Sequence, residues 1–111
     1  MEPNILLIGK NLETLKILKD ELVKFKRTIF YANSKATIDS CLKNDRINLI
    51  IIGAGLPIEI KENMLSFIDS NFPNIEKHIM ERTPGITPAS MIGYTNEKAV
   101  MWRLLNVNNT D

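Results

Sequence analysis

The sequence predicts an α/β fold in which helices cover both faces of a parallel sheet, making a three-layer α/β/α sandwich. Residues 5–8 and 49–52 are continuous apolar runs without a polar face, which is typical of strands that are buried on both sides. Between these runs, apolar residues recur every three or four positions, as in helices that pack on one side. Strands that alternate with helices in this way form parallel sheets through right-handed crossovers.

Each of the first seven elements has a local signal. A stripe of apolar residues from Leu12 to Phe25 indicates the first helix, and Asn11 is suited to cap its first turn. Ser34 is suited to cap the second helix, and Pro73 ends the third. The expected strands are residues 5–8, 28–31, 49–52 and 77–81, and the expected helices are residues 12–25, 35–43 and 60–71.

The last thirty residues predict a less regular ending. Two prolines and a glycine lie within residues 82–89, so a fourth helix there is expected to be short or missing. A turn or two of helix fits after Thr87 and Pro88, and Gly93 is a suitable stop.

Beyond that point we expect a fifth strand at residues 91–95 and a closing helix at residues 96–106. Alternating apolar residues at positions 100, 102 and 104 leave a strand open as the alternative to this closing helix. The chain is thus expected to form one domain over residues 1–111, with a five-stranded parallel sheet.

Composition narrows the class of partner and the compartment. Fourteen basic and thirteen acidic residues leave a net charge of +1, so neither nucleic acid nor a membrane surface is an expected partner. No apolar run approaches the roughly 20 residues of a membrane span, and the first ten residues do not form a signal peptide. Cys41 is the one cysteine and cannot form an internal disulfide, which fits a reducing cytoplasm.

The segment of residues 48–57, with its strand followed by Gly53 and then by Leu56-Pro57, resembles receiver domains of bacterial two-component response regulators. The order and spacing of strands and helices over residues 4–83 agree with this resemblance. It implies a flavodoxin-like sheet with strand order 2-1-3-4-5. In that family an aspartate at the end of the third strand accepts phosphate, and two residues after it precede a Leu-Pro or Met-Pro pair.

The chain departs from the family at the residues that carry the chemistry. Gly53 stands at the position of the phosphate-accepting aspartate, and Gly9 and Lys10 stand where two acidic residues hold magnesium. Thr83 corresponds to the family's Ser or Thr after the fourth strand, whereas its Lys-Pro pair has no counterpart. Phosphoryl transfer needs a nucleophile and a metal. The resemblance therefore implies a degenerate form, a pseudo-receiver that works without phosphorylation, with no catalytic, metal or cofactor residue and no enzymatic activity.

The main alternative is a small-molecule or nucleotide-binding domain that uses the glycines at the strand ends, which are Gly9, Gly53 and Gly55. The order Gly53-Ala54-Gly55 after a strong strand is similar to the start of a dinucleotide fingerprint, but Ile58 stands where the third glycine belongs. His78 has no second histidine or cysteine to share a metal with, so a structural role is expected.

The expected partner is another protein or a second copy of the chain. A connection as short as residues 82–89 leaves apolar side chains of the C-terminal region poorly covered, and exposed apolar patches mark interfaces. The candidate interface consists of Met91, Ile92, Tyr94, Met101 and Trp102, with Trp102 as its anchor. The alternative is that Trp102 seals the core under a helix.

Overall fold

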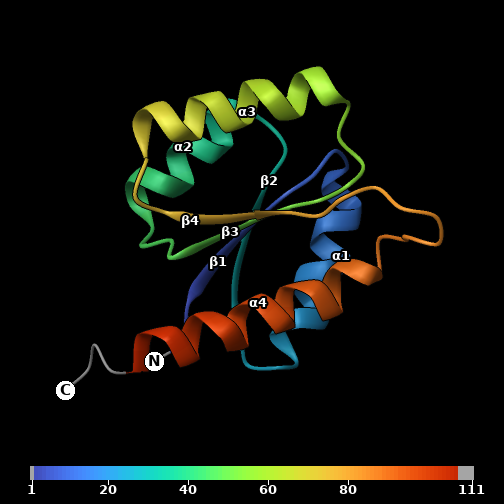
Figure 1. The fold of residues 1–111 in the computed structure, drawn as a ribbon, viewed down its shortest axis with the longest axis vertical. Coiled ribbons are helices and arrows are strands. Elements are labelled where there is room, and N and C mark those ends of the chain that lie inside the picture. Colours follow the sequence, from blue (N-terminus) through green and yellow to red (C-terminus); the bar gives the residue numbers. More distant parts are fainter. Residues whose placement is uncertain (1, 108–111) are drawn as a thin grey trace.

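The protein is described by a computed structural model that covers residues 2–107 (Figure 1). Strands and helices alternate from end to end. In chain order the elements are β1 (Asn4–Ile8), α1 (Leu12–Val23), β2 (Thr28–Ala32), α2 (Lys35–Asn44), β3 (Leu49–Ile52), α3 (Ile58–Asn71), β4 (Glu76–Ile79) and α4 (Ser90–Asn106). The first seven lie within a few residues of their predicted positions.

The four strands form one parallel sheet in the order β2-β1-β3-β4 (Figure 1). Every residue of β3 is fully buried, as are residues 5–8 of β1, because both strands lie in the middle of the sheet and are covered on both faces. This burial is the reason for their continuous apolar sequences. The predicted α/β architecture with a parallel sheet is therefore confirmed.

Helices α1 and α4 cover one face of the sheet, and α2 and α3 cover the other (Figure 1). Successive side chains of a strand point to opposite faces. Ile5 and Leu7 accordingly pack against α1 and α4, whereas Leu6 and Ile8 pack against α2 and α3. The result is three layers with two separate apolar cores.

Local capping explains where α1 and α2 begin. The side-chain oxygen of Asn11 accepts hydrogen bonds from the backbone N–H groups of Glu13 and Thr14, at 2.9 and 3.2 Å. Ser34 caps α2 by accepting from the N–H of Thr37 at 3.3 Å.

The expectation that Leu12 and Phe25 belong to the buried stripe of α1 is wrong, because both are about half exposed, at 47% and 56%. Phe25 lies beyond Val23, where α1 ends.

The C-terminal region differs from the sequence prediction. Residues 91–95 are helical and belong to α4, so the expected fifth strand does not exist there, and the alternative of a strand over residues 100–104 is also wrong. The physical reason is the spacing of the buried residues of α4. Met91, Thr95, Ala99 and Trp102 recur at steps of four, four and three, which place them on one helical face. Gly93 lies inside this helix and does not end it.

The loop before α4 contains the turn that starts this helix. Gly85 has a positive φ of 86°, a conformation that glycine adopts without strain. The backbone N–H of Thr87 then donates to Oγ of Ser90 at 3.2 Å, and the N–H of Ser90 donates to the carbonyl of Thr87 at 3.0 Å. Because residues 91–95 belong to α4 and form no fifth strand, β4 is an edge strand within the described residues. No helix of residues 2–107 is both long and apolar enough to cross a membrane.

Candidate functional site

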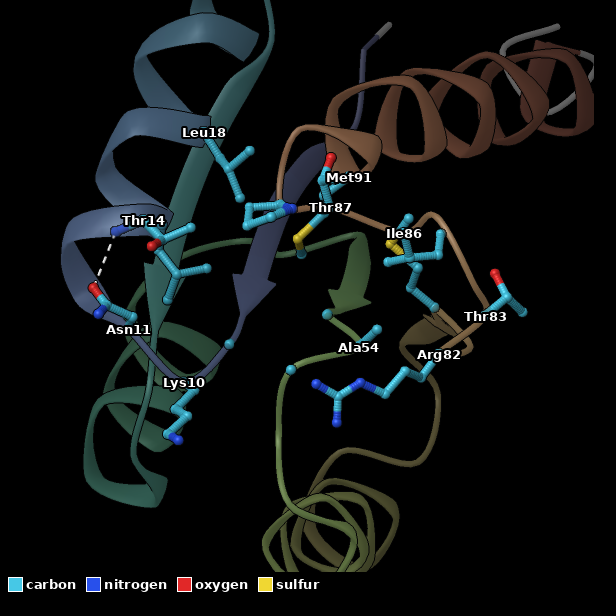
Figure 2. Close-up of a pocket in the computed structure, with 16 residues that line it drawn as sticks. Lys10, Asn11, Thr14, Leu18, Ala54, Arg82, Thr83, Ile86, Thr87 and Met91 are labelled. Atoms are coloured by element: carbon cyan, nitrogen blue, oxygen red, sulfur yellow. Dashed lines mark hydrogen bonds between the residues drawn. The ribbon is translucent and has the colours of Figure 1, made fainter.

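A cavity of about 300 Å³ lies at the carboxyl ends of the central strands (Figure 2). The loops after β1 and β3, the first half of α1 and the segment that leads from β4 into α4 form its walls. In open parallel sheets ligands bind outside the carboxyl ends of the strands. The cavity is therefore the candidate functional site. The residues singled out in the sequence, which are Gly9, Lys10, Gly53 and Thr83, all line it.

Gly9 and Gly53 are buried, and each allows an apolar side chain to approach the backbone. A Cβ atom at position 9 would lie 3.0 Å from Cδ2 of Leu15, which is closer than carbon atoms pack. A Cβ atom at position 53 would lie 3.4 Å from the sulfur of Met91. Met91 thus covers the end of β3 at the position where a longer side chain would project.

Among residues 2–107, two cations and no acid line the cavity. Lys10 and Arg82 are both exposed at its opening, and neither has a carboxylate partner among the described residues. Figure 2 shows the guanidinium of Arg82 directed toward the loop that contains Ala54, and the hydroxyl of Thr83 on the outer rim. Within residues 2–107 there is no group of three or more His, Cys, Asp or Glu side chains that could hold a metal ion.

The backbone around the cavity is partly satisfied already. Asn11 accepts from the N–H groups of Glu13 and Thr14 in the first turn of α1, and Gly53 donates its N–H to the carbonyl of Ile8 at 2.8 Å. The N–H groups of Ala54 and Gly55, in the turn after β3, make no hydrogen bond to any described residue. The cavity has no wall from α3, although α3 follows the glycine-containing loop. This arrangement differs from a dinucleotide site, in which the pyrophosphate lies at the helix that follows the glycines.

The predicted interface residues do not form one exposed patch. Met91 and Trp102 are buried, at 5% and 9% exposure, because both face the sheet from α4. The expectation that the chain leaves Met91 and Trp102 poorly covered is wrong, and the alternative, that Trp102 seals the core, agrees with this burial. Tyr94 is half-buried and donates its hydroxyl to the carbonyl of Ile79 at 3.2 Å, at the outer edge of β4, and Ile92 is also half-buried.

Met101 is exposed as predicted, and it has exposed apolar neighbours that the sequence analysis did not single out. Val100, Leu104 and Leu105 lie on α4 and are exposed, with Leu104 at 63% and Leu105 at 71%. The spacing of Ala99, Trp102 and Leu105 predicts that all three share one face of the closing helix, and for Leu105 the expected burial is wrong, because it is exposed near the end of α4. We call these four residues (Val100, Met101, Leu104 and Leu105) the α4 apolar face.

The remaining reactive side chains lie elsewhere. His78 contacts Glu76 at 2.8 Å on the edge strand. Cys41 is half-buried on α2, where desolvation by burial and then the charge of Asp45 raise the pKa of its thiol. A thiol with a raised pKa is a weak nucleophile at neutral pH. Neither residue lines the cavity.

The order of strands and helices, with a parallel sheet in the order 2-1-3-4, defines a response-regulator-like α/β fold. The crystal structure of a response regulator from Thermotoga maritima superposes on 87% of this chain and 97% of its own, with a TM-score of 0.63 and 13% sequence identity. At this identity the similarity establishes the fold alone. No family model matches the sequence, and no curated protein matches it.

Proposed function

We propose that the protein is a phosphorylation-independent receiver-like module that acts in signal transduction or regulation by binding another protein or a second copy of itself. The single observation that carries the proposal is a response-regulator-like fold whose strand-end site holds Met91 against Gly53 in place of an acidic group.

The chemistry of the strand ends supports independence from phosphorylation. A phosphorylated receiver needs a carboxylate nucleophile and a metal ion that neutralises the phosphate charge. Position 53 has no side chain, and position 10 has a cation that would repel a metal. No acidic residue lines the cavity, so no other described side chain there replaces the missing ligands. A receiver-like fold without these groups can still bind a partner through its surface.

The α4 apolar face supports the interaction role. Its four exposed apolar residues lie within six positions of one helix, outside the buried positions Ala99 and Trp102. Clustered exposed apolar residues mark interaction sites more often than scattered ones do. Because Met91 and Trp102 are buried, the proposed contact depends on the exposed apolar residues in the second half of α4.

The first experiment tests phosphorylation. Purified protein is incubated with acetyl phosphate and magnesium and measured by intact-mass spectrometry, beside a receiver domain that carries the acceptor aspartate. We expect the comparison receiver to gain one phosphate and this protein to keep its mass. A one-phosphate adduct that hydroxylamine removes would contradict the proposal.

The second experiment tests the interaction face. The double variant Met101→Glu/Leu104→Glu places charges on the α4 apolar face, and Ile58→Glu is the control, since Ile58 is also an exposed apolar residue and α3 covers the opposite face of the sheet. The wild type and Ile58→Glu are expected to self-associate in light scattering, or to retain the same binding protein in a pull-down, whereas the double variant loses this contact. Equal behaviour of all three proteins would contradict the assignment of the α4 apolar face.

A further inference from the structure

The strand-end cavity has an apolar floor that the proposed function does not use. Leu15, Leu18, Met80 and Met91 line it and are buried, and half-buried Ile86 lies on one side of it (Figure 2). Water that fills a cavity lined in this way finds few polar partners, so an apolar group can replace it favourably. This floor is suited to hold the apolar body of a ligand.

The opening of the same cavity is cationic. Lys10 and Arg82 lie there without a carboxylate partner among the described residues, whereas Arg27 and Arg103 both bind Glu2 elsewhere in the molecule. No aspartate or glutamate of the part of the chain that the structure describes lines the cavity. Arg82 is directed toward the loop that contains Ala54 (Figure 2), and the N–H groups of Ala54 and Gly55 in this loop make no hydrogen bond to any described residue. Cations and free backbone N–H groups together are donors for a carboxylate or a phosphate.

We propose that this cavity binds a small organic anion, with its carboxylate or phosphate monoester group between Lys10, Arg82 and the loop after β3 and its apolar body against Met80 and Met91. The volume of about 300 Å³ is at the lower end of the range for ligand sites and fits a molecule of about one ring better than a dinucleotide. The binding is noncovalent and needs no metal. It is independent of the interaction role of α4, because no residue of the α4 apolar face lines the cavity.

The test is a titration of isotope-labelled protein followed by the shifts of its backbone amide signals. The probes are benzoate and phenyl phosphate, which combine a ring with the two anionic groups, and benzyl alcohol and inorganic phosphate, which each lack one part. We expect saturable shifts at residues 9–15, 53–55 and 80–91 with at least one ring-bearing anion, and the better of the two identifies the anionic group. Benzyl alcohol and inorganic phosphate are expected to bind at least about tenfold more weakly. Benzyl alcohol lacks the charge-assisted hydrogen bonds of the anionic group, and inorganic phosphate lacks the contact of the ring.

Three variants distinguish this site from general attraction of anions. Arg82→Gln is expected to weaken binding about tenfold. Arg46→Gln removes the same charge from an exposed arginine just before β3, at the opposite end of the sheet, and is expected to leave binding unchanged. Gly55→Leu places a side chain at the cavity wall, where a Cβ atom meets no described atom within 4 Å, and is expected to abolish binding while the protein remains folded. Absence of saturable shifts with both ring-bearing anions, or equal losses in Arg82→Gln and Arg46→Gln, would overturn the proposal.

Discussion

At the scale of single residues, the contact between Gly53 and Met91 decides what the strand-end site can do. Gly53 is buried at the end of β3, and the sulfur of Met91 lies 3.4 Å from the place where the Cβ atom of a side chain would be. The absence of a carboxylate at position 53 is visible in the sequence. That Met91 covers this position is visible only in the structure, because 38 positions separate the two residues and α4 was expected to begin later.

This contact predicts different outcomes for two substitutions at position 53. Gly53→Ala adds a methyl group at ordinary contact distance from Met91, so the free energy of unfolding is expected to change by less than about 1 kcal/mol. Gly53→Asp directs a carboxylate against the thioether and is expected to lower this free energy by about 1–3 kcal/mol. Urea unfolding measures both values, and the additional substitution Met91→Ala should reduce the difference between Asp and Ala. An aspartate as well tolerated as alanine would show that the end of β3 is open.

At the scale of elements, the sequence predicts seven of the eight described helices and strands and misjudges the eighth. The signals of the seven lie in the local sequence, such as the apolar run of residues 49–52 and the capping residues Asn11 and Ser34, and the signal of the more polar fourth strand is the weakest. The eighth, α4, contains Gly93, which was interpreted as a helix stop, and begins two residues after Pro88. Glycine can end a helix or lie at an exposed position inside one. Which of the two occurs depends on tertiary packing, and the neighbouring residues in the sequence do not determine it.

Gly93 provides the test of α4 as a continuous helix. It is exposed, its φ is not positive, and a Cβ atom there would meet no atom within 4 Å apart from the helix's own backbone. In a helix interior Gly93→Ala is expected to raise the free energy of unfolding by about 0.5–1 kcal/mol, because alanine loses less backbone entropy on folding. If Gly93 instead ended a helix in the left-handed conformation, alanine would be destabilising. Thermal and urea unfolding of the wild type and Gly93→Ala give the sign.

At the scale of the whole molecule, α4 replaces the fifth strand as the element that completes the fold. It packs beside α1 on one face of the sheet and leaves β4 as an edge strand within the described residues (Figure 1). The edge is short, carries Lys77, and has the carbonyl of Ile79 occupied by Tyr94, all of which disfavour pairing with another strand. A surface for a partner is therefore more favourable on α4 than on the sheet edge.

The position of α4 also depends on a network of polar side chains that joins both ends of the described chain. Arg27, just before β2, donates to Oε2 of Glu2 at 2.9 Å and to Oδ1 of Asn96 on α4 at 3.0 Å. Arg103, near the end of α4, binds the other oxygen of Glu2 at 3.0 Å. No local sequence pattern indicates such a network, because its partners are 25 to 101 positions apart.

The side chain of Arg27 is 9% exposed, whereas in the ion pair at the end of α1 the side chain of Lys24 is 68% exposed and that of Glu21 is 45% exposed. This contrast predicts that removing the charge of Arg27 and removing that of Lys24 have unequal effects on stability. Arg27→Met keeps the apolar stem but leaves Asn96 without its donor and Glu2 with one partner, so the free energy of unfolding should fall by about 1–3 kcal/mol. Lys24→Met should change it by less than about 0.5 kcal/mol, because exposed pairs are screened by water and salt. Arg27→Lys retains the charge but cannot reproduce both hydrogen bonds in the same geometry, so a value between the other two is expected. Urea unfolding of the three variants measures the differences, and equal values for Arg27→Met and Lys24→Met would show that the network does not hold α4 in place.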